Sequence, residues 1–213
     1  MKKIVILISG RGSNMQTLLK AGLPCQIAAV ISNRADAEGL AVACQQGITT
    51  KIIPHRDYAD RASFDAALLQ EIDRHQPDYI LLAGFMRILT EQFVNYYRGR
   101  LINIHPSLLP SYTGMNTHER ALQDGVKIHG CTVHFVTPDL DHGPIIIQAA
   151  VPVLQNDTPQ TLAARVLLEE HRIYAQAIRW LCSERVRLEA NGKVVSDCAE
   201  QSSTALISPA LEN

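Results

Sequence analysis

Apolar residues in the first half of the chain form short runs that alternate with amphipathic stretches. Each run is rich in β-branched residues, which is typical of a strand buried on both faces of a sheet. The amphipathic stretches have helical spacing, and in residues 63–77 one stripe contains Phe64, Leu68, Leu69 and Ile72. The pattern predicts strands at 3–9, 26–32, 50–54, 78–85 and 101–105, and helices at 14–22, 36–47, 63–77 and 90–97. Strands and helices in this alternation form an open parallel sheet with helices on both faces.

The second half of the chain has a different pattern. Two apolar runs, residues 127–137 and 143–153, are separated by a short polar link, which favours an antiparallel pair of strands. Residues 157–184 form one long amphipathic helix, with Thr158 as the N-cap and Pro159 in the first turn. The predicted fold class is therefore α/β. It is a Rossmann-like open sheet, mostly parallel in the N-terminal half, with an antiparallel C-terminal part and one long helix.

The length of 213 residues favours a single domain, which we expect to cover residues 1–195. A small hairpin around Asn191 and Gly192 closes this domain at residues 186–195. The weak patterning of residues 196–213 predicts a loosely held tail.

Charge and cysteine content limit the classes of function. A net charge of -1 gives no general attraction to nucleic acid or to an anionic membrane, so neither partner is expected. The chain contains no apolar stretch near the ~20 residues of a membrane span, and its start lacks the features of a signal peptide. The five cysteines form no CxxC pair, and their number is odd, which favours a reducing compartment. We therefore expect a cytoplasmic protein.

The glycine-rich sequence SGRGSN, residues 9–14, lies between the first predicted strand and helix. The backbone N–H groups of Gly12, Ser13 and Asn14 would lie at the helix N-terminus, where they can bind an anion. The loop lacks both the GxGxxG fingerprint and the lysine of a P-loop, so a mononucleotide or sugar phosphate fits it better than NAD or ATP. An alternative is a turn in which Ser or Asn caps the helix.

Two polar residues, Asn103 and His105, end the predicted strand at 101–105. Side chains alternate along a strand, so both should project from one face, at the carboxyl edge where open α/β sheets bind ligands. An amide can donate to a developing oxyanion, and an imidazole can move a proton near neutral pH. The alternative is a buried structural histidine, but the pairing of the two residues favours a catalytic site.

Two acidic residues could complete such a site. Asp141 lies in the polar link between the antiparallel strands and could orient His105, although it could equally be a turn residue that accepts from the backbone. Glu170 falls on the apolar stripe of the long helix and needs a partner there. That partner could be an amine or ribose hydroxyl of a ligand, or an internal cation, unless the stripe has widened to solvent. The spacing of His118, His129 and His134 matches no common metal site, so no metal is expected.

Together these residues resemble a known family, the folate-dependent formyltransferases. The resemblance rests on NIHPSLLP at 103–110, AGFMRIL at 83–89 and the aspartate of LDHGP at 140–144, and it runs in order over roughly residues 1 to 185. Three further segments, SGRGSN, SNRADAEGL at 32–40 and HGCTVHFV at 129–136, resemble the branch that formylates glycinamide ribonucleotide in purine biosynthesis. The chain departs from the family pattern at Thr113, where proline is usual, and at His142.

The resemblance implies transfer of a formyl group from the co-substrate 10-formyltetrahydrofolate to the amine of glycinamide ribonucleotide. It implies that residues 1–100 form a mononucleotide-binding half and residues 101–195 a catalytic and folate-binding half. The catalytic residues would be Asn103, His105 and Asp141. The ribonucleotide would bind at Gly12, Ser13, Asn14 and Glu170. The folate would bind at Arg61, Met86, Arg87, Ile88, Leu89 and Asn103.

Two alternatives remain open. The same catalytic residues could formylate another amine, such as that of a sugar nucleotide, or the protein could be a non-catalytic sensor of folate or nucleotide. In each case the partners are small molecules, and the protein is expected to be a monomer or a homodimer.

Overall fold

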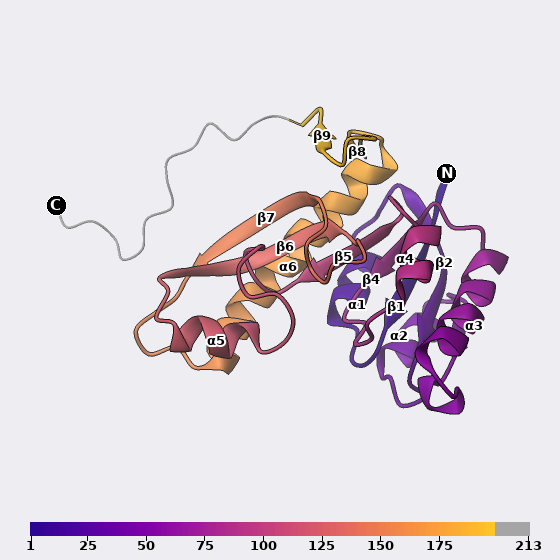
Figure 1. Cartoon of the computed structure of the whole chain (residues 1–213), viewed down its shortest axis with the longest axis horizontal. Coiled ribbons are helices and arrows are strands. Elements are labelled where there is room, and N and C mark those ends of the chain that lie inside the picture. The colour runs from indigo at the N-terminus through magenta and orange to yellow at the C-terminus, as the bar shows by residue number, and fades with distance from the viewer. Residues whose placement is uncertain (199–213) are drawn as a thin grey trace. The chain divides into compact units, whose positions relative to one another are not determined.

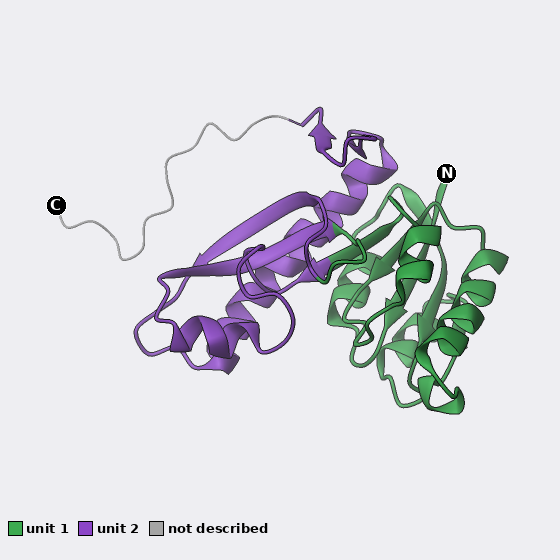
Figure 2. Ribbon diagram, viewed as in Figure 1, with its two compact units in different colours: residues 1–103, 135–140 green, residues 104–134, 141–213 purple. Residues whose placement is uncertain are grey.

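A computed structural model of the chain describes residues 1–198 and divides into two compact units (Figures 1 and 2). Unit 1 contains residues 1–103 and 135–140, and unit 2 contains residues 104–134 and the described residues from 141 onward. The prediction of a loosely held tail falls, for residues 199–213, outside the described part of the chain. The prediction that residues 1–195 form a single domain stays a prediction.

Unit 1 contains a parallel sheet with the strand order β3-β2-β1-β4-β5 (Figure 1). Its strands are β1 (Lys2–Ile8), β2 (Cys25–Ser32), β3 (Thr50–Ile52), β4 (Tyr79–Leu82) and β5 (Leu101–His105), the last of which runs on into unit 2. Its helices are α1 (Ser13–Lys20), α2 (Gly39–Gln45), the 3-10 helix η1 (His55–Asp57), α3 (Arg61–Arg74) and α4 (Glu91–Tyr96). The predicted alternation of strands and helices is confirmed.

The core of unit 1 explains why its strands are continuously apolar. Residues 4–8 of β1 are fully buried, because helices cover both faces of a parallel sheet. On α3, Phe64, Leu68 and Ile72 are buried in the same core, and Leu69 packs against it partly exposed. The predicted stripe is therefore the face that anchors α3 to the sheet.

Several elements of unit 1 are shorter than predicted, for local reasons. β4 ends at Leu82, because Gly84 adopts a left-handed conformation (φ 76°) that cannot continue a strand. α2 begins at Gly39 instead of residue 36, and the Gly39 N–H donates to the carbonyl oxygen of Gly10 (3.1 Å). The N-terminus of α2 thus packs directly against the glycine-rich loop.

Unit 2 is built on an antiparallel pair, β6 (Ile128–Phe135) and β7 (Ile145–Pro152), as predicted. The long helix α6 (Pro159–Cys182) packs along this pair, and its N-cap is Thr158, as predicted, with a capping box to Thr161 (Figure 1). A two-stranded sheet, β8 (Val186–Leu188) and β9 (Val194–Ser196), confirms the predicted hairpin.

The order of the whole sheet is β3-β2-β1-β4-β5-β6-β7, which is the mixed, mostly parallel α/β fold expected from the sequence. The short helix α5 (Thr117–Gln123) was not predicted. Among residues 1–198, none of the helices has the length and apolar character needed to cross a membrane.

Candidate functional site

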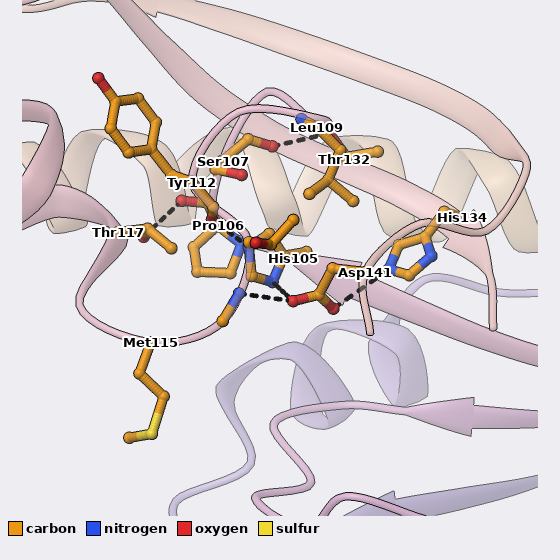
Figure 3. Close-up of polar contacts among 12 residues, drawn as sticks. His105, Pro106, Ser107, Leu109, Tyr112, Met115, Thr117, Thr132, His134 and Asp141 are labelled. Atoms are coloured by element: carbon orange, nitrogen blue, oxygen red, sulfur yellow. Dashed lines mark hydrogen bonds and ion pairs between the residues drawn. The ribbon is translucent and has the colours of Figure 1, made fainter. Parts of the chain in front are cut away.

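The side chains of His105 and Asp141 lie together in unit 2 (Figure 3). His105 is the last residue of β5, and Asp141 lies in the link between β6 and β7. The His105 Nδ1 atom is 3.5 Å from Oδ2 of Asp141, and both side chains are largely buried. The structure therefore brings together two of the predicted catalytic residues that are far apart in sequence. Asn103 lies two residues before His105 on β5, so its side chain projects from the same face of the strand.

Hydrogen bonds determine the orientation of the His105 ring. Its Nε2 atom is 2.9 Å from the carbonyl oxygen of Tyr112, and because a carbonyl oxygen can only accept, Nε2 carries a proton. Nδ1 is then the ring nitrogen that faces the Asp141 carboxylate. In the imidazolium form, both N–H groups of His105 have an acceptor.

Asp141 has three partners, two of which the sequence analysis did not assign to it (Figure 3). Its Oδ2 accepts a hydrogen bond from the backbone N–H of Gly114 (2.8 Å), and its Oδ1 lies 4.0 Å from Nε2 of His134. Asp141 therefore acts both as the partner of His105 and as a backbone acceptor. His134 was considered only as a metal ligand. The sequence feature that could have identified His134 is the alternation of side chains along β6, which places His134 on the same face of the strand as Thr132.

The segment that follows His105 is anchored by the buried hydroxyl group of Thr132 on β6 (Figure 3). This hydroxyl donates to the carbonyl oxygen of Ser107 (2.7 Å) and accepts from the N–H of Leu109 (3.1 Å). Gln148 on β7 donates to the Leu109 carbonyl oxygen and to the Thr132 hydroxyl (both 2.9 Å). These contacts fix the turn that carries Tyr112, and with it the carbonyl group that orients His105.

Two other histidines of unit 2 form a neutral pair beside this turn. Nε2 of His129 is 3.2 Å from Nδ1 of His118, so one ring donates to the other. Burial, together with the neighbouring His118, lowers the pKa of His129 to about 4, and burial also lowers the pKa of His118. Neither ring therefore adds a positive charge next to His105 at neutral pH.

The glycine-rich loop lines a hollow of about 210 Å³ in unit 1, which the sequence predicted as a phosphate site. The N-cap of α1 is Gly12, in a left-handed conformation (φ 68°), and no side chain among residues 1–198 caps this helix end. The alternative in which Ser or Asn caps the helix is therefore wrong. The N–H groups of the first turn of α1 face no acceptor in their own helix and are suited to an anion. The hollow is lined by Ser9, Gly10, Arg11, Gly12, Ser13, Asn14, Ala83, Gly84 and Met86.

The residues predicted to meet folate also lie in unit 1, and two of them are unusually exposed for apolar side chains. Met86 is 71% exposed and Ile88 is 57% exposed. Exposed apolar side chains of this kind suit an aromatic ligand. The Arg87 guanidinium lies 5.9 Å from the centre of the Phe64 ring, and its buried Nε atom finds no hydrogen-bond partner among residues 1–198. Leu89 packs against the core, and Arg61 is exposed at the start of α3.

Glu170 lies on the buried face of α6 and is only 8% exposed, so the alternative of a stripe that has widened to solvent is wrong. Its carboxylate adds to the effect of burial on Cys131 of β6, and together they raise the pKa of that thiol to about 12. Cys131 is thus a neutral, buried thiol and no nucleophile.

Among residues 1–198 there is no group of three or more His, Cys, Asp or Glu side chains suited to a metal ion. The expectation that no metal is bound stays a prediction.

Comparison with known proteins agrees with the fold. Residues 2–178 match the family model described as Formyl transferase. The phosphoribosylglycinamide formyltransferase of Escherichia coli (strain K12) is 47% identical over 192 residues, which cover 88% of this chain and 91% of that protein. The trifunctional purine biosynthetic protein adenosine-3 of Homo sapiens is 47% identical over 196 residues, which cover 90% of this chain and 19% of that protein.

A solved structure is similar over nearly the whole chain. The phosphoribosylglycinamide formyltransferase from Coxiella burnetii, in complex with CHES, is 51% identical and has a TM-score of 0.88. The similarity covers 92% of this chain and 93% of that one. The extent of the family match and the identity to these relatives lead to one conclusion: this chain belongs to the formyl transferase family.

Proposed function

We propose that this protein transfers the formyl group of 10-formyltetrahydrofolate to the amine of N1-(5-phospho-D-ribosyl)glycinamide, a step of purine biosynthesis. The names of its relatives from Escherichia coli and Coxiella burnetii support this substrate. The observation that carries the proposal is the contact of His105 with Asp141, with Nε2 of His105 bound to the Tyr112 carbonyl group.

The reaction begins when the amine of the ribonucleotide attacks the formyl carbon, which gives a tetrahedral intermediate with a negatively charged oxygen. The amide of Asn103 and the positive charge of the His105 imidazolium stabilise this oxyanion. One donor such as this amide is worth about 3 kcal/mol of transition-state stabilisation. The oxyanion then re-forms the carbonyl group, and the bond between the formyl carbon and folate N10 breaks.

Proton transfer completes the exchange. The attacking nitrogen loses a proton and the departing folate nitrogen gains one, so that the products are the formylated ribonucleotide and tetrahydrofolate. Asp141 keeps His105 oriented for this transfer through its contact with Nδ1. No covalent enzyme intermediate is required.

Binding of the two substrates is assigned to separate groups of residues. The phosphate group binds the N–H groups of Gly12, Ser13 and Asn14, and Glu170 binds the ribonucleotide. The folate lies along Met86, Arg87, Ile88 and Leu89 and also meets Asn103, while Arg61 binds its acidic end. Residues 1–100 thus form the mononucleotide-binding half of a single domain, and residues 101–195 carry the catalytic residues.

The test is a formyl-transfer assay that follows folate absorbance with and without the ribonucleotide. Turnover that requires the ribonucleotide supports the proposal. Loss of the formyl group without any acceptor would indicate a hydrolase, and turnover only with an amino-sugar nucleotide would indicate another acceptor. Binding of both ligands without turnover would indicate a sensor.

The remaining expectations stay predictions. We expect the protein to be cytoplasmic and to be a monomer or a homodimer. We also expect it to act on small molecules and to bind no metal, nucleic acid or membrane. Light scattering after size-exclusion chromatography would determine the number of subunits.

A further inference from the structure

We propose that Ser9 is a positioning residue whose hydroxyl group holds the folate-binding segment, residues 86–89, against the phosphate-binding loop. One buried hydroxyl would then set the position of the folate-binding segment relative to the phosphate-binding loop. This inference rests on the proposed function and deepens it, because it concerns how the two binding segments of unit 1 are held together.

Ser9 is the first residue after β1 and begins the glycine-rich loop. It is only 7% exposed, and its Oγ atom accepts a hydrogen bond from the backbone N–H of Met86 (2.8 Å). The Ser9 N–H also donates to the carbonyl oxygen of Gly84 (3.2 Å). Ser9 thus binds the chain that follows β4 at two residues, Gly84 and Met86.

The direction of the hydrogen bonds is fixed. Because Met86 donates to Ser9 Oγ, the Ser9 hydroxyl directs its own proton to Oδ1 of Asn33 (2.6 Å). This orients the Asn33 amide, which is 3% exposed, so that its oxygen faces Ser9. The chain of bonds therefore runs from Met86 through Ser9 to Asn33, and Ser9 cannot turn away without breaking it.

Packing supports the segment at Leu89 but contributes little at Met86. Met86 is 71% exposed, so packing of its side chain contributes little to its position. Gly84, two residues earlier, is left-handed and marks the point where the chain leaves β4. Ser9, Gly12 and Met86 also line the same hollow of about 210 Å³, so a shift of Met86 changes the wall opposite the phosphate loop.

Ser9→Ala removes the hydroxyl without adding volume. The expected result is a rise of about fivefold to tenfold in the KM for 10-formyltetrahydrofolate, which corresponds to the loss of one neutral hydrogen bond. The KM for the ribonucleotide should change less than twofold, because the backbone N–H groups at the start of α1 remain in place.

Ser32→Ala is the matched control. Ser32 ends the neighbouring strand β2, is also buried, and accepts a hydrogen bond from the N–H of Arg34 (3.1 Å). Among the described residues it has no bond to residues 86–89. Both variants lose one buried hydroxyl. Only Ser9→Ala should change the KM for the folate.

Amide hydrogen exchange at Met86 in the wild-type protein tests the same contact without any substitution. The amide should be protected although its side chain is exposed, and binding of the ribonucleotide should slow its exchange further. An unprotected amide, or an exchange rate unchanged by the ribonucleotide, would overturn the inference. Equal shifts of both KM values in Ser9→Ala, or no shift, would also overturn it. A wild-type protein that transfers no formyl group would instead count against the proposed function.

Discussion

His105 is held at both of its ring nitrogens, by a backbone carbonyl group and by a carboxylate, so a change of a few atoms there should act on chemistry more than on folding. We predict that His105→Ala and Asp141→Asn each lower kcat by about 10²-fold to 10³-fold, because each removes a charge that stabilises the oxyanion or its donor. Steady-state kinetics gives kcat, and circular dichroism shows whether the fold persists.

A histidine outside the site provides the control for this prediction. His75→Gln changes a ring that lies 3.4 Å from Glu71 in unit 1, and its kcat should equal that of the wild type. If both site variants keep kcat within a factor of two of the wild type, the assignment of the catalytic residues is wrong.

The residue types at the site could be predicted from sequence, but several contacts could not. Asn103 and His105 stand out because they end a strand together, and Asp141 because it lies in a polar link. The roles of the Tyr112 carbonyl and the Gly114 N–H cannot be recognised from residue types, because every sequence possesses such backbone groups. They reach His105 and Asp141 only because the turn folds back, with Tyr112 in a left-handed conformation (φ 55°).

At the level of secondary-structure elements, the turn after β5 depends on the hydroxyl group of Thr132 on β6. We predict that Thr132→Val lowers kcat by about tenfold and the free energy of unfolding by about 1–3 kcal/mol. The isosteric valine leaves the Leu109 N–H and the Ser107 carbonyl without their buried partner. Kinetics and urea unfolding measure the two effects.

Thr132→Ser is the matched control, because serine keeps the hydroxyl group and loses only a methyl group. It should retain most of the activity that valine loses. Similar kcat values for the serine and valine variants would mean that the hydroxyl does not position the turn.

The N-terminus of α1 depends on a glycine that no other residue replaces without strain. Gly12 has φ 68°, and a Cβ atom there would lie 3.0 Å from the Met15 side chain. We predict that Gly12→Ala lowers the free energy of unfolding by about 1 kcal/mol and raises the KM for the ribonucleotide at least tenfold. Unfolding curves and substrate titrations give both values.

Gly22→Ala separates backbone strain from ligand binding. Gly22 is also left-handed (φ 58°), but no described atom lies within 4 Å of its added Cβ, and it is outside the loop. It should show a similar loss of stability and an unchanged KM. An equal rise in KM for both variants would contradict the role given to Gly12.

Strong periodicity made most elements predictable, and weak periodicity explains the exceptions. The apolar stripe of α3 and the capped start of α6 each combine several residues that indicate the same helix. Helix α5 has only seven residues, and its N-cap, Asn116, is left-handed without a side-chain cap among the described residues. Such a helix is stabilised by tertiary contacts more than by its own sequence.

Across the whole molecule, stability should depend on pH through the buried His129. Its pKa lies near 6.5 in the unfolded chain and at about 4 in the fold, because burial disfavours the charged ring. The unfolded state therefore binds the proton first as the pH falls. The stabilisation is complete above pH 6.5 and is lost progressively as the pH falls to about 4, by on the order of 3 kcal/mol.

Urea unfolding between pH 4 and pH 8 measures this loss. In His129→Gln the decline below pH 6.5 should be clearly smaller, because glutamine does not titrate. The lowered pKa of His118 acts in the same direction, so part of the decline remains. Identical pH profiles for variant and wild type would show that His129 is not the source.

The helix α6 carries Trp180, the only tryptophan of the chain, and this gives the protein a built-in optical reporter. Its fluorescence follows unit 2 alone, whereas far-ultraviolet circular dichroism follows the helices of both units. If the chain is a single cooperative domain, the two signals will change at the same urea concentration. Two separate midpoints would mean that the phosphate-binding loop and the catalytic turn can melt independently. A substrate that binds only one of them would then shift the unfolding midpoint of one signal and leave the midpoint of the other unchanged.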